Sequence, residues 1–97
     1  MIKGLSETEN EIVNSILSPY KAHYKFFAYG SRVKGNFRQL SDLDIYVESV
    51  DKDVSTSDIE SLKTAFDNSN LSFTVNFAYD VSEDFYKLIE KDFVALW

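Results

Sequence analysis

The chain has 97 residues, 44% of them hydrophobic and 27% charged, which allows one modest core and predicts a single domain over residues 1–97. Its formal net charge of −6 argues against a direct duplex nucleic acid partner, because proteins of that class usually present a basic face to the phosphates. The chain contains no cysteine, no apolar run of about 18 residues and no secretory signal, so we expect a cytoplasmic protein without disulfides, thiolate metal sites or membrane contacts.

The first predicted element is an amphipathic helix over residues 7–18. Ser6 and Glu9 have the spacing of a capping box, in which each side chain bonds the backbone N–H of the other residue. The apolar positions recur at helical spacing and are Ile12, Val13, Ile16 and Leu17. Pro19 is expected to end the helix, because its ring blocks the next turn.

Two strands joined by a polar connection are predicted next. Residues 24–29 are largely apolar and aromatic, which favours a buried strand. A brief helical turn is expected over residues 31–34. Residues 42–48 then alternate between polar and apolar side chains, which is the period of a strand with one buried face.

The second half of the chain is predicted to form a helix, a strand, a helix and a short edge strand. These elements cover residues 58–67, residues 71–79, a helix that starts at Ser82, and the tail 93–97. The first of these helices is expected to begin with a capping box at residues 57–60. The order of elements predicts an α+β domain with a small mixed β-sheet backed by helices.

The chemically informative stretch joins the first two strands. Gly30-Ser31 ends the first strand, ten residues follow, and Asp42 and Asp44 open the second strand. Side chains two apart in a strand share a face, so these carboxylates lie roughly 6.5–7 Å apart along the strand. Such carboxylates repel unless a proton or a hard cation lies between them, and backbone N–H groups at a Gly-Ser corner can bind an anion. This pattern indicates Mg²⁺–nucleotide chemistry.

These residues carry a family resemblance. Gly30-Ser31, ten residues and Asp42-Leu43-Asp44 resemble the signature of the minimal nucleotidyltransferases of the DNA polymerase beta superfamily. The local sequences Gly-Ser-Arg-Val-Lys-Gly and Ser-Asp-Leu-Asp-Ile match as well. The resemblance extends more loosely over nearly the whole chain. It implies a polymerase beta-like fold and transfer of a nucleoside monophosphate, with AMP from ATP as the first expectation, to an acceptor.

The resemblance implies that Asp42 and Asp44 bind Mg²⁺. The family places a third aspartate on the strand after the second helix, and the matching position here is Asn76. An amide can offer a metal one neutral oxygen, but it cannot accept a proton or supply charge. Asp80, the nearest carboxylate, lies about 13 Å further along an extended strand. This departure weakens metal binding and leaves open a catalytically degenerate module that binds a nucleotide or a partner.

The phosphate-binding residues are also implied by the resemblance. The backbone N–H groups of Gly30 and Ser31, with the Ser31 hydroxyl, would hold the terminal phosphates. Arg32 and Lys34 would supply counter-charge. For Arg32, Lys34 and Arg38, a solvated basic patch is an equally weighted alternative.

Members of this size resemble the antitoxin-like half of two-component modules, whose other half is a helical HEPN-domain toxin. The chain has little length for an acceptor-binding domain of its own, so an acceptor supplied by such a partner is physically reasonable. Three classes of function stay open: an active nucleotidyltransferase, a degenerate binding module, and a plain interaction module in which the spacing is coincidence.

Overall fold

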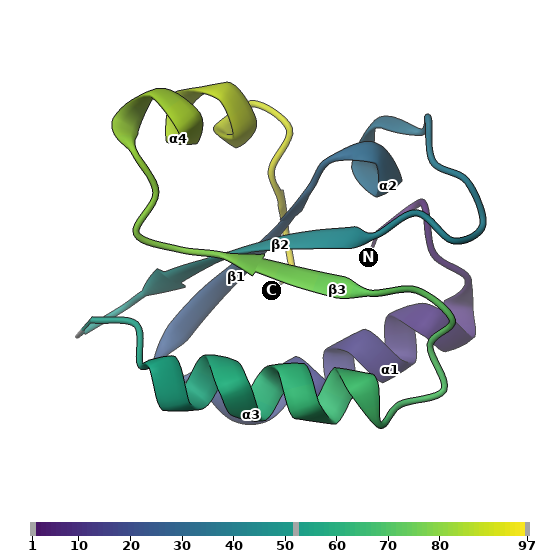
Figure 1. Ribbon diagram of the computed structural model, residues 1–97, viewed down its shortest axis with the longest axis horizontal. Coiled ribbons are helices and arrows are strands. Elements are labelled where there is room, and N and C mark those ends of the chain that lie inside the picture. The colour runs from purple at the N-terminus through teal and green to yellow at the C-terminus, as the bar shows by residue number, and fades with distance from the viewer. Residues whose placement is uncertain (1, 52, 97) are drawn as a thin grey trace.

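The computed structural model describes residues 2–51 and 53–96, and Figure 1 shows a central sheet with helices on both sides. The strands are β1 (Tyr24–Tyr29), β2 (Leu43–Ser49), β3 (Val75–Ala78) and β4 (Val94–Ala95). The helices are α1 (Glu7–Leu17), the 3₁₀ helix η1 (Ser18–Tyr20), α2 (Ser31–Lys34), α3 (Thr56–Asp67) and α4 (Glu83–Glu90). None of these helices, within the described residues, is long and apolar enough to cross a bilayer.

The sheet is mixed, as predicted. Its order is β3-β2-β1-β4, with β1 antiparallel to both β2 and β4, and β2 parallel to β3. The predicted α+β class is therefore confirmed. The tail forms the predicted edge strand over its middle, while its last residue, Trp97, lies outside the described residues.

The capping box at the start of α1 is confirmed. The Ser6 hydroxyl accepts a hydrogen bond from the Glu9 N–H at 3.1 Å, and Glu9 Oε1 accepts one from the Ser6 N–H at 2.8 Å. The α-helix ends at Leu17, one residue before the predicted end, and the chain continues through Pro19 as a 3₁₀ turn. Proline is compatible with the first positions of such a turn, because it needs no N–H donor there.

The predicted start of α3 is wrong by two residues. The N-cap is Ser55 rather than Ser57, and its hydroxyl accepts from the Asp58 N–H at 3.3 Å. The reason is a tertiary contact with β1. The Tyr24 hydroxyl donates to Asp58 Oδ2 at 2.6 Å and accepts from the Ser55 N–H at 3.1 Å, so Tyr24 selects which of two nearby serines caps the helix.

The third strand is shorter than the predicted residues 71–79. It pairs with β2 only from Val75 to Ala78, and Thr74 adds one hydrogen bond by accepting from the Leu43 N–H at 2.9 Å. The alternation of side chains before Val75 continues without ladder pairing. An alternating pattern therefore marks the buried face correctly but overstates the length of the strand.

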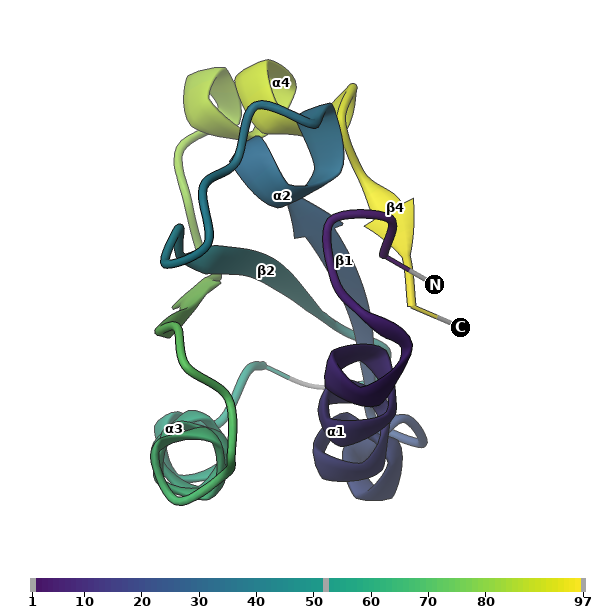
Figure 2. The same ribbon diagram turned by 90° about the vertical axis from the view of Figure 1, so that its right-hand side faces the viewer.

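The hydrophobic core fills one side of the sheet. In Figure 2, α1 and α3 lie beside each other on this side, and α2 and α4 lie on the other. The strand residues that point into the core are Tyr24, Phe26, Ala28, Leu43, Ile45, Val47 and Val75. Their neighbours in sequence point to the second face, which carries Asp44, Tyr46 and Asn76.

Aromatic rings attach the C-terminal segment to this second face. The Phe93 ring stacks on Phe27 and on Tyr46, with ring centroids 5.0 and 5.3 Å apart. Tyr86 of α4 meets Tyr46 edge-on at 5.4 Å. The apolar residues of α4 are only partly buried, because Ile89 is covered while Phe85 and Leu88 are exposed.

Candidate active site

Strand register brings the acidic residues and the amide together. Asp44 of β2 lies opposite Asn76 of β3 on one side and opposite Tyr29 of β1 on the other. Asp42 lies immediately before β2, two residues from Asp44, and so reaches the same face. Residues more than 30 positions apart in the chain thus meet at one place on the second face of the sheet.

The Asn76 side chain joins the two carboxylates. Its Nδ2 donates to Asp42 Oδ2 at 3.0 Å and makes a longer contact of 3.4 Å with Asp44 Oδ1. Oxygens from two different aspartates therefore converge on one point, which a nitrogen bearing two hydrogens now occupies. Asp42 and Asn76 are exposed and Asp44 is half-buried, so this point is open to a ligand.

The predicted Gly-Ser corner lies against the same carboxylate. Gly30 has φ +85° and ψ −160°, a backbone conformation that is essentially restricted to glycine. A Cβ at this position would lie only 2.5 Å from Asp44 Oδ2. Gly30 thus permits the turn and leaves space for the carboxylate, and Ser31 begins α2 directly beside it. The first N–H groups of a helix have no partner within the helix and can bind an anion.

The electrostatics of the site reflect this crowding. Partial burial raises the pKa of Asp44, and the charge of Asp42 raises it further, while the hydrogen bond from Asn76 acts in the opposite direction. Burial also raises the pKa of Tyr29, with a smaller contribution from the charge of Asp44. A cation beside Asp44 would oppose these effects by favouring the ionised carboxylate.

Arg32 has a different environment from the one predicted. Only 3% of the residue is exposed, and its guanidinium donates to three backbone carbonyls. Nε donates to Ser41 at 3.0 Å, Nη2 to Gln39 at 2.8 Å and Nη1 to Gly4 at 2.9 Å. The side chain therefore connects the loop before the acidic strand to the N-terminal segment. Because its hydrogen-bond donors are used in this way, the environment of Arg32 argues against the predicted role as a phosphate counter-charge.

Aromatic rings complete the environment of Arg32. The guanidinium carbon lies 4.2 Å from the centroid of the Phe73 ring and 5.1 Å from that of Phe37. These contacts compensate for burial of the charge. The carbonyl of Ser41 directly precedes Asp42, so Arg32 acts on the site by positioning the chain that leads into it.

Gly4 is part of this arrangement and was not predicted. A Cβ there would overlap the Arg32 carbonyl oxygen, so only glycine lets the N-terminal segment pack against α2. The sequence offers no signal for this contact, because its partner is a backbone atom 28 positions away.

The other basic residues do not converge on the carboxylates. The Lys34 ammonium pairs with Asp92 at 3.4 Å and stays about half exposed. Arg38 has an exposed side chain, and its backbone N–H donates to the Ser41 hydroxyl at 2.7 Å. Of the predicted counter-charges, only Lys34 has an exposed charged group within the described residues.

The donor set at the site suits a hard divalent cation. Two carboxylates and one amide are oxygen donors of the kind that Mg²⁺ binds. The amide nitrogen, whose hydrogens carry partial positive charge, already stands where a cation would neutralise both aspartates. Within residues 2–51 and 53–96, no three His, Cys, Asp or Glu side chains cluster as possible metal ligands.

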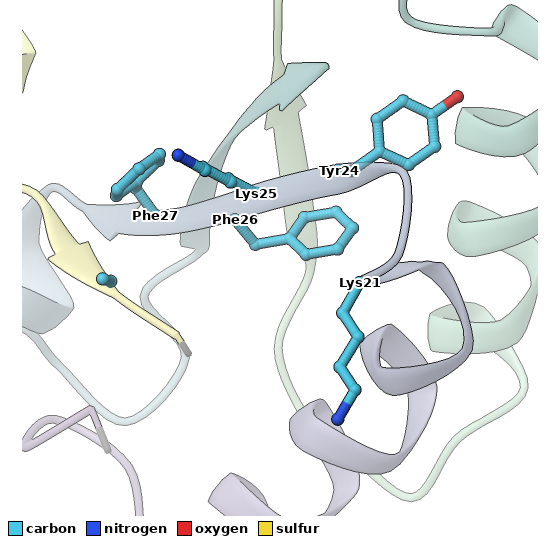
Figure 3. Close-up of a pocket in the computed structure, with 6 residues that line it drawn as sticks. Lys21, Tyr24, Lys25, Phe26 and Phe27 are labelled. Atoms are coloured by element: carbon cyan, nitrogen blue, oxygen red, sulfur yellow. The ribbon is translucent and has the colours of Figure 1, made fainter. Parts of the chain in front are cut away.

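A separate cavity of about 320 Å³ lies at the opposite end of β1 (Figure 3). It is lined by Lys21, Tyr24, Lys25, Phe26, Phe27 and Ala95. None of these residues belongs to the predicted site. The cavity borders the start of β1, whereas the carboxylates lie beside its last residue, Tyr29.

Comparison with known proteins agrees with this geometry. A family model described as a nucleotidyltransferase domain matches residues 9–95. A relative from Haemophilus influenzae, described as probable protein adenylyltransferase MntA, is 34% identical over 94 residues. The match covers 95% of this chain and 82% of that protein. The matched region includes the Gly-Ser corner, both aspartates and the amide.

Proposed function

This chain belongs to the nucleotidyltransferase domain family, and we propose that it transfers AMP from ATP to a hydroxyl of an acceptor protein, with release of pyrophosphate. The family supports transfer of a nucleoside monophosphate in general; the base, the ion and the acceptor are proposed here. The observation that carries the assignment is the convergence of Asp42 and Asp44 on one point beside Gly30.

Asp42 and Asp44 would hold Mg²⁺ through their carboxylate oxygens, with the Asn76 amide oxygen as a neutral third ligand. When bound, the ion would supply positive charge that offsets the negative charge developing on the leaving pyrophosphate. Gly30 and Ser31 would bind phosphate oxygens through backbone N–H groups.

Lys34 is the side chain proposed to add positive charge at the phosphates, since its ammonium is exposed and its ion pair with Asp92 is of the weak, solvated kind. Arg32 is assigned to the loop, because its guanidinium is buried and bonded to carbonyls.

In the transfer, the acceptor oxygen forms a bond to the α-phosphorus while the bond from that phosphorus to the bridging oxygen of the β-phosphate breaks. Pyrophosphate leaves with the electron pair of that bond. The hydroxyl proton has to pass to a carboxylate or to water, because the Asn76 amide cannot accept it.

The relative's description as a protein adenylyltransferase supports a protein acceptor. The family resemblance suggests that this acceptor is a HEPN-domain protein supplied in trans. The second face of the sheet keeps Asp42 and Asn76 exposed, which leaves access for an acceptor from outside the chain.

The test uses ATP labelled at the α-phosphate, Mg²⁺ and a HEPN-domain protein as the proposed acceptor. We expect label on the partner, and loss of that label with Asp42→Ala plus Asp44→Ala. Equal labelling by the double variant would contradict the proposed site. ATP labelled at the γ-phosphate is the control, since adenylylation leaves that label on pyrophosphate.

A second candidate is a binding module that has lost turnover, which the amide at Asn76 favours. It predicts that the unsubstituted protein binds ATP with Mg²⁺ but transfers no label. Under this alternative, Asn76→Asp restores the third carboxylate and should produce transfer where the unsubstituted protein shows none.

A further inference from the structure

We infer that the Asn76 side chain has two working positions: without an ion it bridges Asp42 and Asp44 through its nitrogen, and with an ion it turns to present its oxygen. This extends the proposed function, on which it rests for the location of the ion. In this inference Asn76 takes the place of the cation when no ion is bound, so it is more than a weakened metal ligand.

The hydrogen-bond chemistry requires the first position. Ionised carboxylates only accept hydrogen bonds, so an amide that contacts two of them must present its N–H₂ group. Nδ2 lies 3.0 Å from Asp42 Oδ2 and 3.4 Å from Asp44 Oδ1, which allows one hydrogen for each aspartate. The amide thereby holds together two carboxylates that form no ion pair with a basic side chain in the part of the chain that the structure describes.

A cation at the same point requires the second position. The ion would lie between the amide and the two carboxylates, where the hydrogens of the N–H₂ group now point, and would repel them, whereas the amide oxygen attracts it. Half a turn about the Cβ–Cγ bond exchanges the two ends of the amide. This torsion is soft and roughly two-fold, and Asn76 is exposed, so packing does not hold the amide in one orientation.

An aspartate at position 76 would behave differently. Without an ion, three carboxylates would face one another, and the hydrogen bonds from Nδ2 would be replaced by repulsion. With an ion, the extra negative charge would strengthen binding. With asparagine at position 76, the stability of the folded site therefore depends less on the ion, and the affinity of the site for the ion is lower.

The first experiment follows the Asn76 side-chain amide in the unsubstituted protein by NMR during titration with Mg²⁺ alone. We expect two inequivalent, exchange-protected protons without Mg²⁺, and an upfield shift with faster exchange as the ion binds. If the backbone amides around Asp44 respond to Mg²⁺ while the Asn76 side-chain pair does not, the turning motion is refuted.

The second experiment compares melting temperatures of Asn76→Asp and Asn70→Asp with and without Mg²⁺. Asn70 is exposed in the turn after α3, so its substitution makes the same charge change away from the site. We expect Asn76→Asp to melt about 5 °C lower than Asn70→Asp without Mg²⁺, from the lost bonds and the added repulsion. Its dissociation constant for Mg²⁺ should be roughly tenfold lower.

The outcomes separate this inference from the proposed function. Equal melting temperatures and equal Mg²⁺ affinities of the two variants would overturn the inference while leaving nucleotidyl transfer intact. If Mg²⁺ stabilises only Asn76→Asp and the unsubstituted protein neither binds it nor transfers label, the ion-free bridging position stands, but the ion-bound position is refuted together with the Mg²⁺-dependent function.

Discussion

At the scale of single residues, Gly30 links the backbone to the carboxylate chemistry. Its φ and ψ are in a region that other residues avoid, and Asp44 Oδ2 occupies the space where a side chain would begin. Gly35, five residues later, has φ +92° but an open environment. Substitutions at these two glycines can therefore separate the effect of backbone strain from the effect of displacing the Asp44 carboxylate.

We predict that Gly30→Ala lowers the free energy of unfolding by about 2–3 kcal/mol and abolishes Mg²⁺-dependent transfer, because Asp44 has to move. Gly35→Ala should cost about 1 kcal/mol of stability and leave transfer intact. Urea titration and the labelled-ATP assay measure both effects. Equal effects of the two substitutions on transfer would contradict the proposed contact.

The raised pKa of Asp44 predicts that the free energy of unfolding depends on pH. Its pKa is raised above the ordinary value of 3.8, so the folded chain holds this proton more tightly than the unfolded chain does. Asp44 therefore adds stability below the unfolded pKa, and this stability is lost as the pH rises through the folded pKa.

Without Mg²⁺, Asp44→Asn, which resembles the protonated form, should unfold at a higher urea concentration than the unsubstituted protein at neutral pH. The difference should shrink as the pH falls through the raised pKa of Asp44, because the unsubstituted side chain then becomes protonated as well. Urea midpoints measured with a chelator across this range test the sign. A difference that does not change with pH would show that Asp44 is not the responsible group.

At the scale of elements, the loop between α2 and β2 depends on Arg32. We predict that Arg32→Ala lowers the free energy of unfolding by about 2–4 kcal/mol, because three carbonyls lose a charged donor and a buried space is left. Arg38→Ala, in the same loop but exposed, should change it by less than about 0.5 kcal/mol.

The same pair of variants tests the alternative assignment of Arg32. If Arg32 bound phosphate, its substitution would lower ATP affinity while the urea midpoint stayed the same. Arg32→Lys should also destabilise the protein, since a single ammonium cannot reach three carbonyls in different directions.

The start of α3 depends on Tyr24 of β1. Tyr24→Phe removes a hydroxyl that bonds both Asp58 and the Ser55 N–H in a nearly buried position. We expect a loss of about 1–2 kcal/mol in the free energy of unfolding, measured by urea titration. Tyr20→Phe, at a half-buried position outside this contact, is the control, and an equal loss there would contradict the prediction.

At the scale of the whole molecule, the site exists only when the sheet is assembled. It draws on β1, α2, β2 and β3, so a ligand that binds it stabilises the native chain as a unit. Mg²⁺ with ATP at about 100 times the dissociation constant should add about 2.7 kcal/mol, or roughly 10 °C or more in melting temperature.

Chelation of Mg²⁺ should reverse this stabilisation. Asp42→Ala plus Asp44→Ala should abolish it, whereas Asp53→Ala plus Asp67→Ala, which removes two exposed carboxylates elsewhere, should leave it unchanged. Thermal melting measures the effect. Stabilisation that survives in the first double variant would place the nucleotide outside the proposed site.

The sequence by itself determined the features that depend on near neighbours. The capping box of Ser6 and Glu9, the strand at residues 24–29 and the Gly-Ser corner were all predicted within a residue or two. Each depends on hydrogen bonds, alternation or backbone preference over a few positions. The spacing to Asp42 and Asp44 pointed to the family for the same reason, since the motif lies in one short segment.

Only the tertiary structure decided how distant groups pair. It placed the Asn76 nitrogen on both aspartates through the register of β2 and β3. It buried Arg32 against backbone carbonyls, which no side-chain pattern reveals. It also placed the Tyr24 hydroxyl against the Ser55 N–H, so that Ser55 is the N-cap of α3. These contacts join residues far apart in the chain, and their energies arise only when packing brings the partners within hydrogen-bond distance.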